Sequence, residues 1–351
     1  MVSHKKSHKT GVLLVNLGTP DSTATPDVRK YLRQFLLDRR VIDIPYLQRW
    51  LLINLIIAPF RAPKSAKLYK QVWLKEGSPL KVYSLQVKDL LAKALGDQYE
   101  VELAMRYQSP SIESVVKPWE DRGLSKLIII PLFPQYASAS TGSATEEVMR
   151  VIQQWELIPN LRIIENFFEH PLFIDAFVAL GRKYMQEQDF DHVVFSYHGL
   201  PERQILKGSV EDHCKLGGCC SHYTANNKYC YRAQCFETTR LLVEKLGLQK
   251  DQYTVCFQSR LGKTPWIKPY ADDVIPELAK AGKKKILFFS PSFVADCLET
   301  IEEGGEEYKE LFLHAGGEHW QLVESLNDSP IWVECLKDLV VRYQESGVSG
   351  Q

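Results

Sequence analysis

The sequence predicts an α/β protein of two Rossmann-like domains, each with a four-stranded parallel sheet flanked by helices. Short apolar runs alternate with amphipathic helical patterns along the 351 residues, which is typical of parallel sheets with right-handed crossovers. Four of the eight runs fall in each half of the chain. No low-complexity stretch separates the halves, so we expect closely packed domains with a ligand cleft between them.

The elements follow from hydrophobic periodicity. Strands are predicted at residues 12–17, 100–105, 127–133, 162–166, 192–197, 254–258, 285–290 and 320–324. Helices are predicted at residues 28–37, 146–155, 172–185, 237–246 and 331–343. We place the domain boundary between residues 165 and 190, giving domains 1–168 and 169–351, the second ending in the C-terminal helix.

Composition excludes several classes of function. The 43 Lys and Arg balance the 43 Asp and Glu, which argues against nucleic acid as a partner and against a polybasic membrane patch. The first ten residues are polar and basic with no apolar core, so we expect no secretory signal and a cytoplasmic location. Eight cysteines in such a chain favour metal or redox chemistry over disulfides.

The most hydrophobic window runs from Tyr46 to Phe60. It is too short to span a bilayer, and Pro59 and Pro63 close it. Two interpretations stay open. The segment is either a helix packed in the core or an exposed apolar lip that contacts a membrane or a hydrophobic ligand.

A histidine ends the strand predicted at residues 192–197. The run stops at His198-Gly199-Leu200-Pro201, and open α/β sheets keep their chemistry at the carboxyl ends of strands. A lone histidine there is also a common structural residue. A second group of candidate site residues lies in the segment 290–303.

Carboxylates follow the strand predicted at residues 285–290. At ~100° per residue, Asp296, Glu299 and Glu303 lie within about 60° of one another on one helical face. Acidic first turns are common in solvated helices. Because this segment and His198 both follow strand ends, the imidazole and the carboxylates can hold a divalent cation and accept protons.

The N-terminal half supplies hydrogen-bond donors within otherwise apolar surroundings. Gly18 allows close backbone approach after the first strand. Arg61, Tyr69 and Ser78 are potential donors, and the hydroxyl-rich loop 134–143 opens a helix that could bind an anion. Each signal is weak alone, but together they suit a flat apolar ligand with carboxylate tails.

Seven ordered motifs resemble those of the ferrochelatase family. They are NLGTP (16–20), EGSPL (76–80), MRY (105–107), PQY (134–136), SYHGLP (196–201), FQSRxGxxPW (257–266) and DCLETxEE (296–303). The resemblance covers residues 11 to 345. It implies two chelatase-type domains and the insertion of Fe²⁺ into protoporphyrin IX, the last step of haem synthesis.

The resemblance also implies roles for single residues. His198 matches the family's invariant histidine, as metal contact or proton acceptor, and Glu299 matches the glutamate that shares the inner metal site. Asp296 and Glu303 match an acidic path for the cation or the protons. The expected porphyrin contacts are Leu17, Ile42, Phe257 and Trp266 on the ring and Arg61, Tyr69 and Ser78 at the propionates. Cys297 stands where some relatives carry a second histidine.

The cysteine-rich segment 213–235 departs from a simple chelatase. It holds Cys214, Cys219, Cys220, Cys230 and Cys235, a density typical of a metal site. Some ferrochelatases hold a [2Fe–2S] cluster, a few through an internal segment, although the spacing here is not that of a plant-type ferredoxin. We favour [2Fe–2S], with structural zinc, free thiols and disulfides as alternatives. We expect Cys214, Cys230, Cys235 and one of Cys219 or Cys220 as ligands.

Three rival functions remain. A close variant would take coproporphyrin, and a member of another class would carry porphyrin or haem without turnover. A nucleotide-binding protein is disfavoured because no GxGxxG or P-loop follows any strand. The predicted partners are the porphyrin and, through the apolar window, the inner membrane as a peripheral contact.

Overall fold

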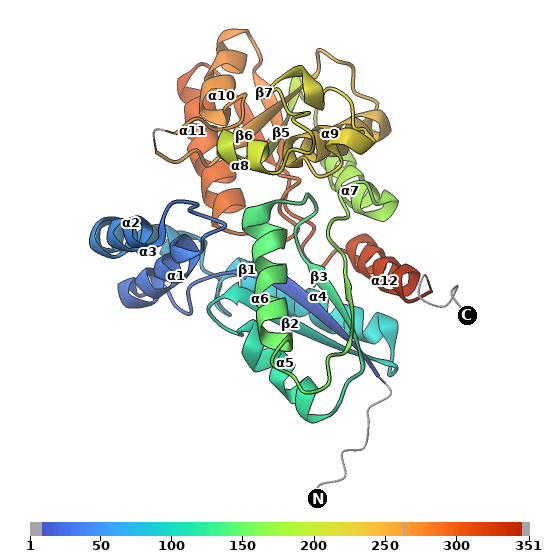
Figure 1. Ribbon diagram of the computed structural model, residues 1–351. Helices are drawn as coiled ribbons and strands as arrows, with labels where there is room; N and C mark the ends of the chain where they lie inside the picture. The colour runs from blue at the N-terminus through green and yellow to red at the C-terminus, as the bar shows by residue number, and fades with distance from the viewer. Residues whose placement is uncertain (1–8, 263, 346–351) are drawn as a thin grey trace, which may run out of the picture. The chain divides into compact units, whose positions relative to one another are not determined.

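The computed structural model describes residues 9–262 and 264–345, and the predicted fold class is confirmed. Two four-stranded parallel sheets form, with strand orders β2-β1-β3-β4 and β6-β5-β7-β8 (Figure 1). All eight predicted strands are present, each end lying within three residues of its predicted position. The chain divides into two compact units, one around each sheet.

The first unit comprises the described residues up to Phe133, Ser138–Asn166 and the segment from Asp328 onward. Its strands are β1 (Thr10–Gly18), β2 (Tyr99–Tyr107), β3 (Lys126–Pro131) and β4 (Asn160–Ile163). Its helices are α1 (Thr25–Leu37), α2 (Tyr46–Leu51), α3 (Ala58–Val72), α4 (Pro79–Leu95), α5 (Ile112–Asp121), α6 (Ser143–Ile152) and α12 (Pro330–Glu345), with the π-helical turns η1 (Leu52–Ile57) and η2 (Ser138–Gly142).

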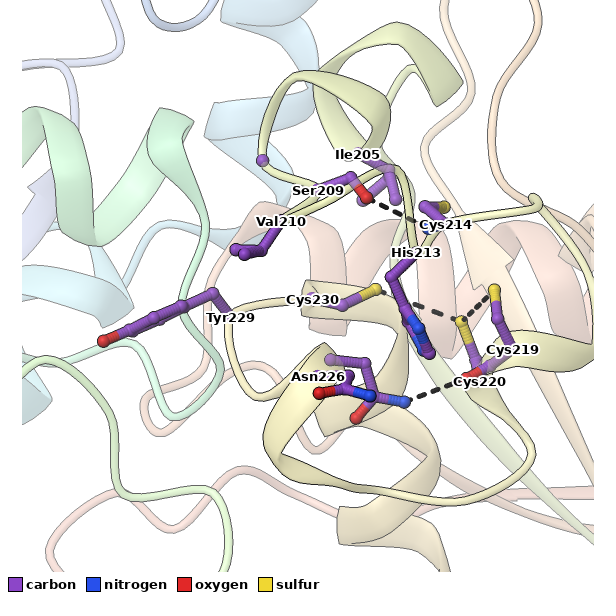
Figure 2. Close-up of a pocket in the computed structure, with 12 residues that line it drawn as sticks. Ile205, Ser209, Val210, His213, Cys214, Cys219, Cys220, Asn226, Tyr229 and Cys230 are labelled. Atoms are coloured by element: carbon purple, nitrogen blue, oxygen red, sulfur yellow. Dashed lines mark hydrogen bonds between the residues drawn. The ribbon is translucent and has the colours of Figure 1, made fainter.

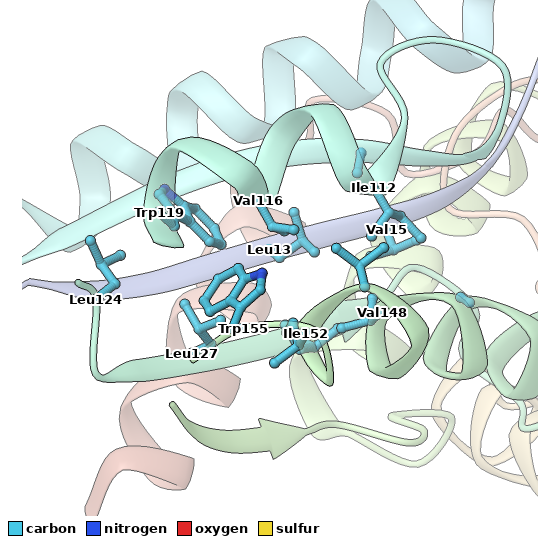
Figure 3. Close-up of a cluster of buried hydrophobic side chains, with 14 residues drawn as sticks. Leu13, Val15, Ile112, Val116, Trp119, Leu124, Leu127, Val148, Ile152 and Trp155 are labelled. Atoms are coloured by element: carbon cyan, nitrogen blue, oxygen red, sulfur yellow. The ribbon is translucent and has the colours of Figure 1, made fainter. Parts of the chain in front are cut away.

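Alternation along β1 separates the two faces of this sheet. Leu13 and Val15 are fully buried under α5 and α6, where Trp119 and Val148 complete the cluster (Figure 3). Helices α4 and α12 pack against each other. The expected assignment of the C-terminal helix to the second domain therefore differs from the observed packing. Periodicity identifies an apolar helix face but not the sheet that buries it.

The second unit comprises Pro134–Ala137 and Phe167–Asn327. Its strands are β5 (His192–His198), β6 (Tyr253–Gln258), β7 (Lys285–Phe289) and β8 (His319–Leu322). Its helices are α7 (Pro171–Glu187), α8 (Glu202–Lys207), α9 (Tyr231–Leu246), α10 (Ala271–Lys280) and α11 (Tyr308–His314), with short turns η3 (Gly218–Cys220) and η4 (Ala225–Asn227) and the π-helix η5 (Glu299–Glu307).

The two faces of the second sheet are both covered. Val194 and Phe288 pack under α10 and α11 with Trp320, while α7 and α9 pack together. Helix α9 begins six residues earlier than predicted, at Tyr231. No helix in the described ranges is long and apolar enough to cross a bilayer.

The two histidines of β5 differ in environment. His192 opens the strand at 4% exposure, with its Nε2 2.8 Å from Thr254 Oγ1. Burial lowers the pKa of His192 to about 4, so near neutral pH it is an uncharged structural residue. His198 closes the strand half-buried. The carboxyl end of β5 is therefore the end that presents an accessible imidazole.

Candidate functional site

His198 presents a single nitrogen lone pair. Its Nδ1 lies 2.6 Å from the carbonyl oxygen of Gly199. A carbonyl oxygen only accepts, so Nδ1 carries the proton and Nε2 keeps its lone pair. That lone pair can bind a metal ion or accept a proton, but not both at once.

The turn after His198 is held by two close contacts. The Gly199 amide donates to the carbonyl oxygen of Gln258 at 2.8 Å. A Cβ added to Gly199 would lie 2.8 Å from that oxygen and 3.2 Å from the Trp266 ring. Only glycine fits there. Trp266 therefore packs on the His198 turn.

Glu303 is a fully occupied carboxylate. Its oxygens accept four hydrogen bonds, from Gln258 Nε2, Ser259 N, Ser259 Oγ and Tyr308 OH. A carboxylate offers about four lone-pair positions. Burial, together with the Glu303 charge, raises the pKa of Tyr308 well above its usual range, so the phenol stays a donor. Glu303 thus fixes β6 to η5 and α11, and no lone pair is left for a cation.

Asp296 lies before η5 and not on it. Its carboxylate accepts from Thr300 Oγ1 at 3.0 Å, Ser325 N at 3.1 Å and Asn327 Nδ2 at 2.7 Å. The single α-helical face expected for residues 296–303 does not form, because the chain enters a π-helix at Glu299. Such turns are rare and frequent at functional sites.

The Glu299 carboxylate has fewer hydrogen-bond partners than those of Asp296 and Glu303. It is half-buried at the start of η5. Burial raises the pKa of the Cys297 thiol, and the Glu299 charge raises it further. No Lys, Arg or His in the described ranges forms an ion pair with Glu299. Of the three predicted acids, Glu299 therefore has the fewest hydrogen bonds to its carboxylate among the described residues, with the Cys297 thiol as its partner.

Gln258 lies between His198 and Glu299, the two candidate metal contacts, and it was not predicted as a site residue. Its Oε1 accepts from Ser196 Oγ at 2.8 Å, and its Nε2 donates to the carbonyl oxygen of Glu299 at 3.1 Å. Gln258 is also the register partner of His198 between β5 and β6. The side chain is 1% exposed. The FQSR motif contained this residue, but no local pattern revealed its partners.

Negative charge accumulates beyond Glu299. Burial raises the pKa of Glu302, and four neighbouring carboxylates raise it further. Burial and nearby acids likewise raise the pKa of Glu307. Such a field attracts cations. Even so, no set of three or more His, Cys, Asp or Glu within the described residues is arranged as a metal site.

Phe257 differs from its expected role. The ring is 1% exposed and packs with Tyr197 and Phe236, each 6.3 Å away between centroids. Phe257 lies on the edge strand β6, where successive side chains alternate between faces, and its ring packs toward Phe236 of α9. The ring is buried between the sheet and α9, and almost none of its surface is open to a ligand.

The predicted contacts of the first unit lie in different environments. Leu17 and Ile42 are half-buried and Arg61 is exposed. Tyr69 and Ser78 are buried, at 8% and 3% exposure. The Ser78 hydroxyl accepts from Thr19 Oγ1 at 2.8 Å, which leaves its own proton for one further acceptor.

Arg106, in the MRY motif, is committed to Asp38. Its Nη2 lies 2.8 Å from Asp38 Oδ2, and Tyr107 OH donates to the same oxygen at 2.9 Å. Burial opposes ionisation, but hydrogen bonds from Ser143 and from the Arg40 amide, with the Arg106 charge, hold the pKa of Asp38 below its usual value. This network joins α1, β2 and α6 and is structural.

Four of the five clustered cysteines line one small cavity. Cys214, Cys219, Cys220 and Cys230 surround it together with His213 (Figure 2). The Cys220 Sγ lies 3.8 Å from that of Cys219 and 3.9 Å from that of Cys230. The hydrogen bond from Cys220 holds the pKa of Cys230 below its usual range, against the effect of burial.

Cys235 does not line this cavity. It is fully buried on α9, against the Tyr231 hydroxyl, and burial raises the pKa of its thiol. All eight cysteines are free thiols in the structure.

The apolar window 46–60 is largely exposed. Its exposed fractions include 67% for Leu47, 60% for Leu55 and 72% for Phe60, whereas Ile53 and Ala58 are buried. The exposed cations Arg61 and Lys64 follow on α3. Of the two interpretations of this window, exposure favours the lip over the core helix.

Comparisons with known proteins agree on one family. A family model described as Ferrochelatase matches residues 9–344. A protein named Ferrochelatase from Coxiella burnetii is 46% identical over 337 residues, which are 95% of this chain and 93% of the relative. Another of that name from Legionella pneumophila is 45% identical over 332 residues, 95% of this chain and 98% of the relative.

Solved structures show a similar fold at low identity. SirB from Bacillus subtilis with Fe³⁺ has a TM-score of 0.55 at 12% identity and covers 95% of both chains. The sirohydrochlorin chelatase SirB from Bacillus subtilis subspecies spizizenii, in complex with cobalt, has a TM-score of 0.52 at 11% identity and covers 98% of both chains.

The different roles of Glu303 and Glu299 predict different effects of the same substitution. Glu303→Gln lowers the free energy of unfolding by about 2 kcal/mol. The NH₂ group of the new carboxamide would face hydrogen-bond donors at the place where a carboxylate oxygen accepted their hydrogen bonds. Glu299→Gln changes it by less than about 0.5 kcal/mol. Urea unfolding of both variants measures the difference. Equal destabilisation by the two substitutions would contradict this division of roles.

Proposed function

Because the chain belongs to the ferrochelatase family, we propose that it inserts Fe²⁺ into protoporphyrin IX and forms protohaem in the last step of haem biosynthesis. The observation that carries the proposal is the pair of groups beside Gln258. His198 offers an Nε2 lone pair, and Glu299 offers a carboxylate whose side-chain partner in the described residues is the Cys297 thiol. A cation and a proton acceptor are both needed for this reaction.

In the proposed reaction Glu299 acts first and His198 acts second. Glu299 takes up Fe²⁺ from water through its carboxylate oxygens, because a hard oxygen ligand suits a hydrated cation in transit. Iron–nitrogen bonds then form as the two pyrrole N–H bonds break. His198 Nε2 accepts one of these protons and passes it to solvent, which a neutral imidazole can do near pH 7. The second proton leaves by way of water.

The other acids have a supporting role in this proposal. Asp296 and Glu303 hold the start of η5 and the end of β6, and they thereby orient Glu299. We propose Leu17, Ile42 and Trp266 as porphyrin contacts. Arg61, Tyr69 and Ser78 remain the proposed partners of the propionates.

We further propose that the thiol cluster, defined as Cys214, Cys219, Cys220 and Cys230, holds a [2Fe–2S] cluster. Two thiolates on one tetrahedral metal, with ~2.3 Å bonds, lie about 3.8 Å apart. The Sγ–Sγ distances of 3.8 and 3.9 Å fit this value. Four thiolates match the ligand number of such a cluster. When bound, the cluster would supply one-electron redox chemistry and cross-link this segment.

We propose a cytoplasmic enzyme whose apolar lip, residues 46–60, rests on the inner membrane. Exposed Leu47, Leu55 and Phe60 would enter the acyl boundary. The exposed Lys64, which follows the lip on α3, would lie at the level of anionic headgroups. This arrangement suits a porphyrin substrate that partitions into membranes.

His198→Ala separates an enzyme from a porphyrin carrier. We expect Fe²⁺ insertion to fall at least about 100-fold, because the proton acceptor is lost, while porphyrin affinity is kept. Insertion is measured with protoporphyrin and with coproporphyrin, and porphyrin affinity by fluorescence quenching. The exposed His314 of α11 supplies the control, and His314→Ala should insert iron normally. Full activity of His198→Ala would refute the assignment, and a preference for coproporphyrin would change the substrate.

The thiol cluster predicts visible absorption in protein purified without oxygen. We expect about two iron atoms and two acid-labile sulfides per chain. Cys230→Ser should abolish the absorption. Cys256→Ala, which changes a buried thiol of β6 outside the cavity, should keep it. Bound zinc without visible bands, or thiols that all react with no metal released, would rule out the iron–sulfur cluster.

The apolar lip predicts binding to anionic vesicles. The double variant Leu47→Ser/Phe60→Ser should lose most co-flotation with phosphatidylglycerol vesicles, because it removes the most exposed apolar area. Leu157→Ser, at a residue 71% exposed elsewhere in the same unit, is the matched control. If the wild type does not float, or if both variants lose flotation equally, the lip is not the membrane contact.

A further inference from the structure

Helix α9 begins between the thiol cluster and the His198 turn. Cys230 is the N-cap of α9, and Tyr231 is its first residue. The Tyr231 side chain is 7% exposed. Its hydroxyl lies 2.8 Å from the carbonyl oxygen of His198 and 3.1 Å from Ser292 Oγ. One hydroxyl therefore touches the turns that follow β5 and β7.

The direction of these hydrogen bonds is fixed by chemistry. The His198 carbonyl oxygen only accepts, so the phenol proton of Tyr231 points to it. The Ser292 hydroxyl then donates to the phenol oxygen. The result is a directed chain from Ser292 through Tyr231 to the backbone of His198. Polar groups buried in such chains reinforce one another.

The His198–Gly199 backbone is thereby held at three atoms. Tyr231 holds the carbonyl oxygen of His198, and Gln258 accepts from the Gly199 amide. The Gly199 carbonyl oxygen in turn accepts from the imidazole Nδ1. The last contact sets the tautomer of the ring, so any rotation of this backbone segment moves the Nε2 lone pair.

We propose that Tyr231 is a positioning residue that couples the thiol cluster to the tautomer and orientation of His198. Cys230 directly precedes Tyr231, and its Sγ lies 3.9 Å from that of Cys220. Any ligand that fixes Cys230 fixes the first turn of α9 and with it the phenol. The inference rests on the proposed function, since it concerns the group that accepts the proton.

Tyr231→Phe tests the hydroxyl and keeps the ring. We expect kcat for Fe²⁺ insertion to fall about tenfold with KM for porphyrin unchanged, because misplacement of a reacting group costs rate and not binding. The ¹⁵N spectrum of labelled imidazoles, with the His198 signal assigned from His198→Ala, should show Nδ1 partly deprotonated. Ser292→Ala, which leaves the ring and the His198 contact in place, should shift the same signal less.

Tyr197→Phe is the matched control. It removes another buried phenol, whose hydroxyl contacts Thr239 of α9 at 2.8 Å and not the His198 turn. We expect kcat and the His198 signal to stay at wild-type values. An equal effect of the two substitutions would show that Tyr231 acts through packing, and the proposal would fall. If Tyr231→Phe does not fold, an unshifted His198 signal in Ser292→Ala overturns it.

A double-mutant cycle tests the coupling to the thiol cluster. Cys230→Ser alone should shift the His198 signal in the same direction as Tyr231→Phe. In the Tyr231→Phe background it should produce no further shift and no further loss of kcat, because the connection is already cut. Additive effects would refute the coupling. Failure of the proposed function would appear separately, as full activity of His198→Ala.

Discussion

The carboxamide of Gln258 is the interaction on which the candidate site depends. It accepts from Ser196 on β5, and it donates to the carbonyl oxygen of Glu299 and to the carboxylate of Glu303. An amide is suited to this place because it accepts at one end and donates twice at the other. A carboxylate could not donate to the two oxygens, and an apolar residue would leave them unpaired. One buried side chain therefore links β5 and β6 to the start of η5, where Glu299 lies.

The eight strands and their parallel order could be predicted because they depend on local hydrophobic runs. The positions of His198 at the end of β5 and of Glu299 after β7 could also be predicted, since both depend on where a strand ends. The partners of Glu303 were not, because Ser259 and Gln258 lie 44 and 45 residues away along the chain. The π-helix at Glu299 was missed for a related reason. An assumed ~100° per residue cannot reveal a change of helix type.

Two groups of possible metal ligands occur in the second unit. His198 lies at the carboxyl end of β5, and Glu299 begins η5. Thiols gather in the segment between α8 and α9, and soft ligands of this kind would suit the proposed iron–sulfur cluster. Helix α9 borders both, since Cys230 precedes it and Tyr231 begins it. Tyr231 directly follows Cys230 and is 33 residues from His198 in the sequence, yet its hydroxyl contacts the carbonyl oxygen of His198.

Each sheet has a tightly packed glycine at the carboxyl end of one of its central strands. Gly18 and Gly199 each end a central strand against a neighbouring carbonyl oxygen, that of Tyr107 and that of Gln258. The residue before the glycine is leucine in the first unit and histidine in the second. A tightly packed glycine thus follows an apolar side chain in the first unit and an imidazole in the second. At this position the second unit, and not the first, therefore carries a side chain that can accept a proton.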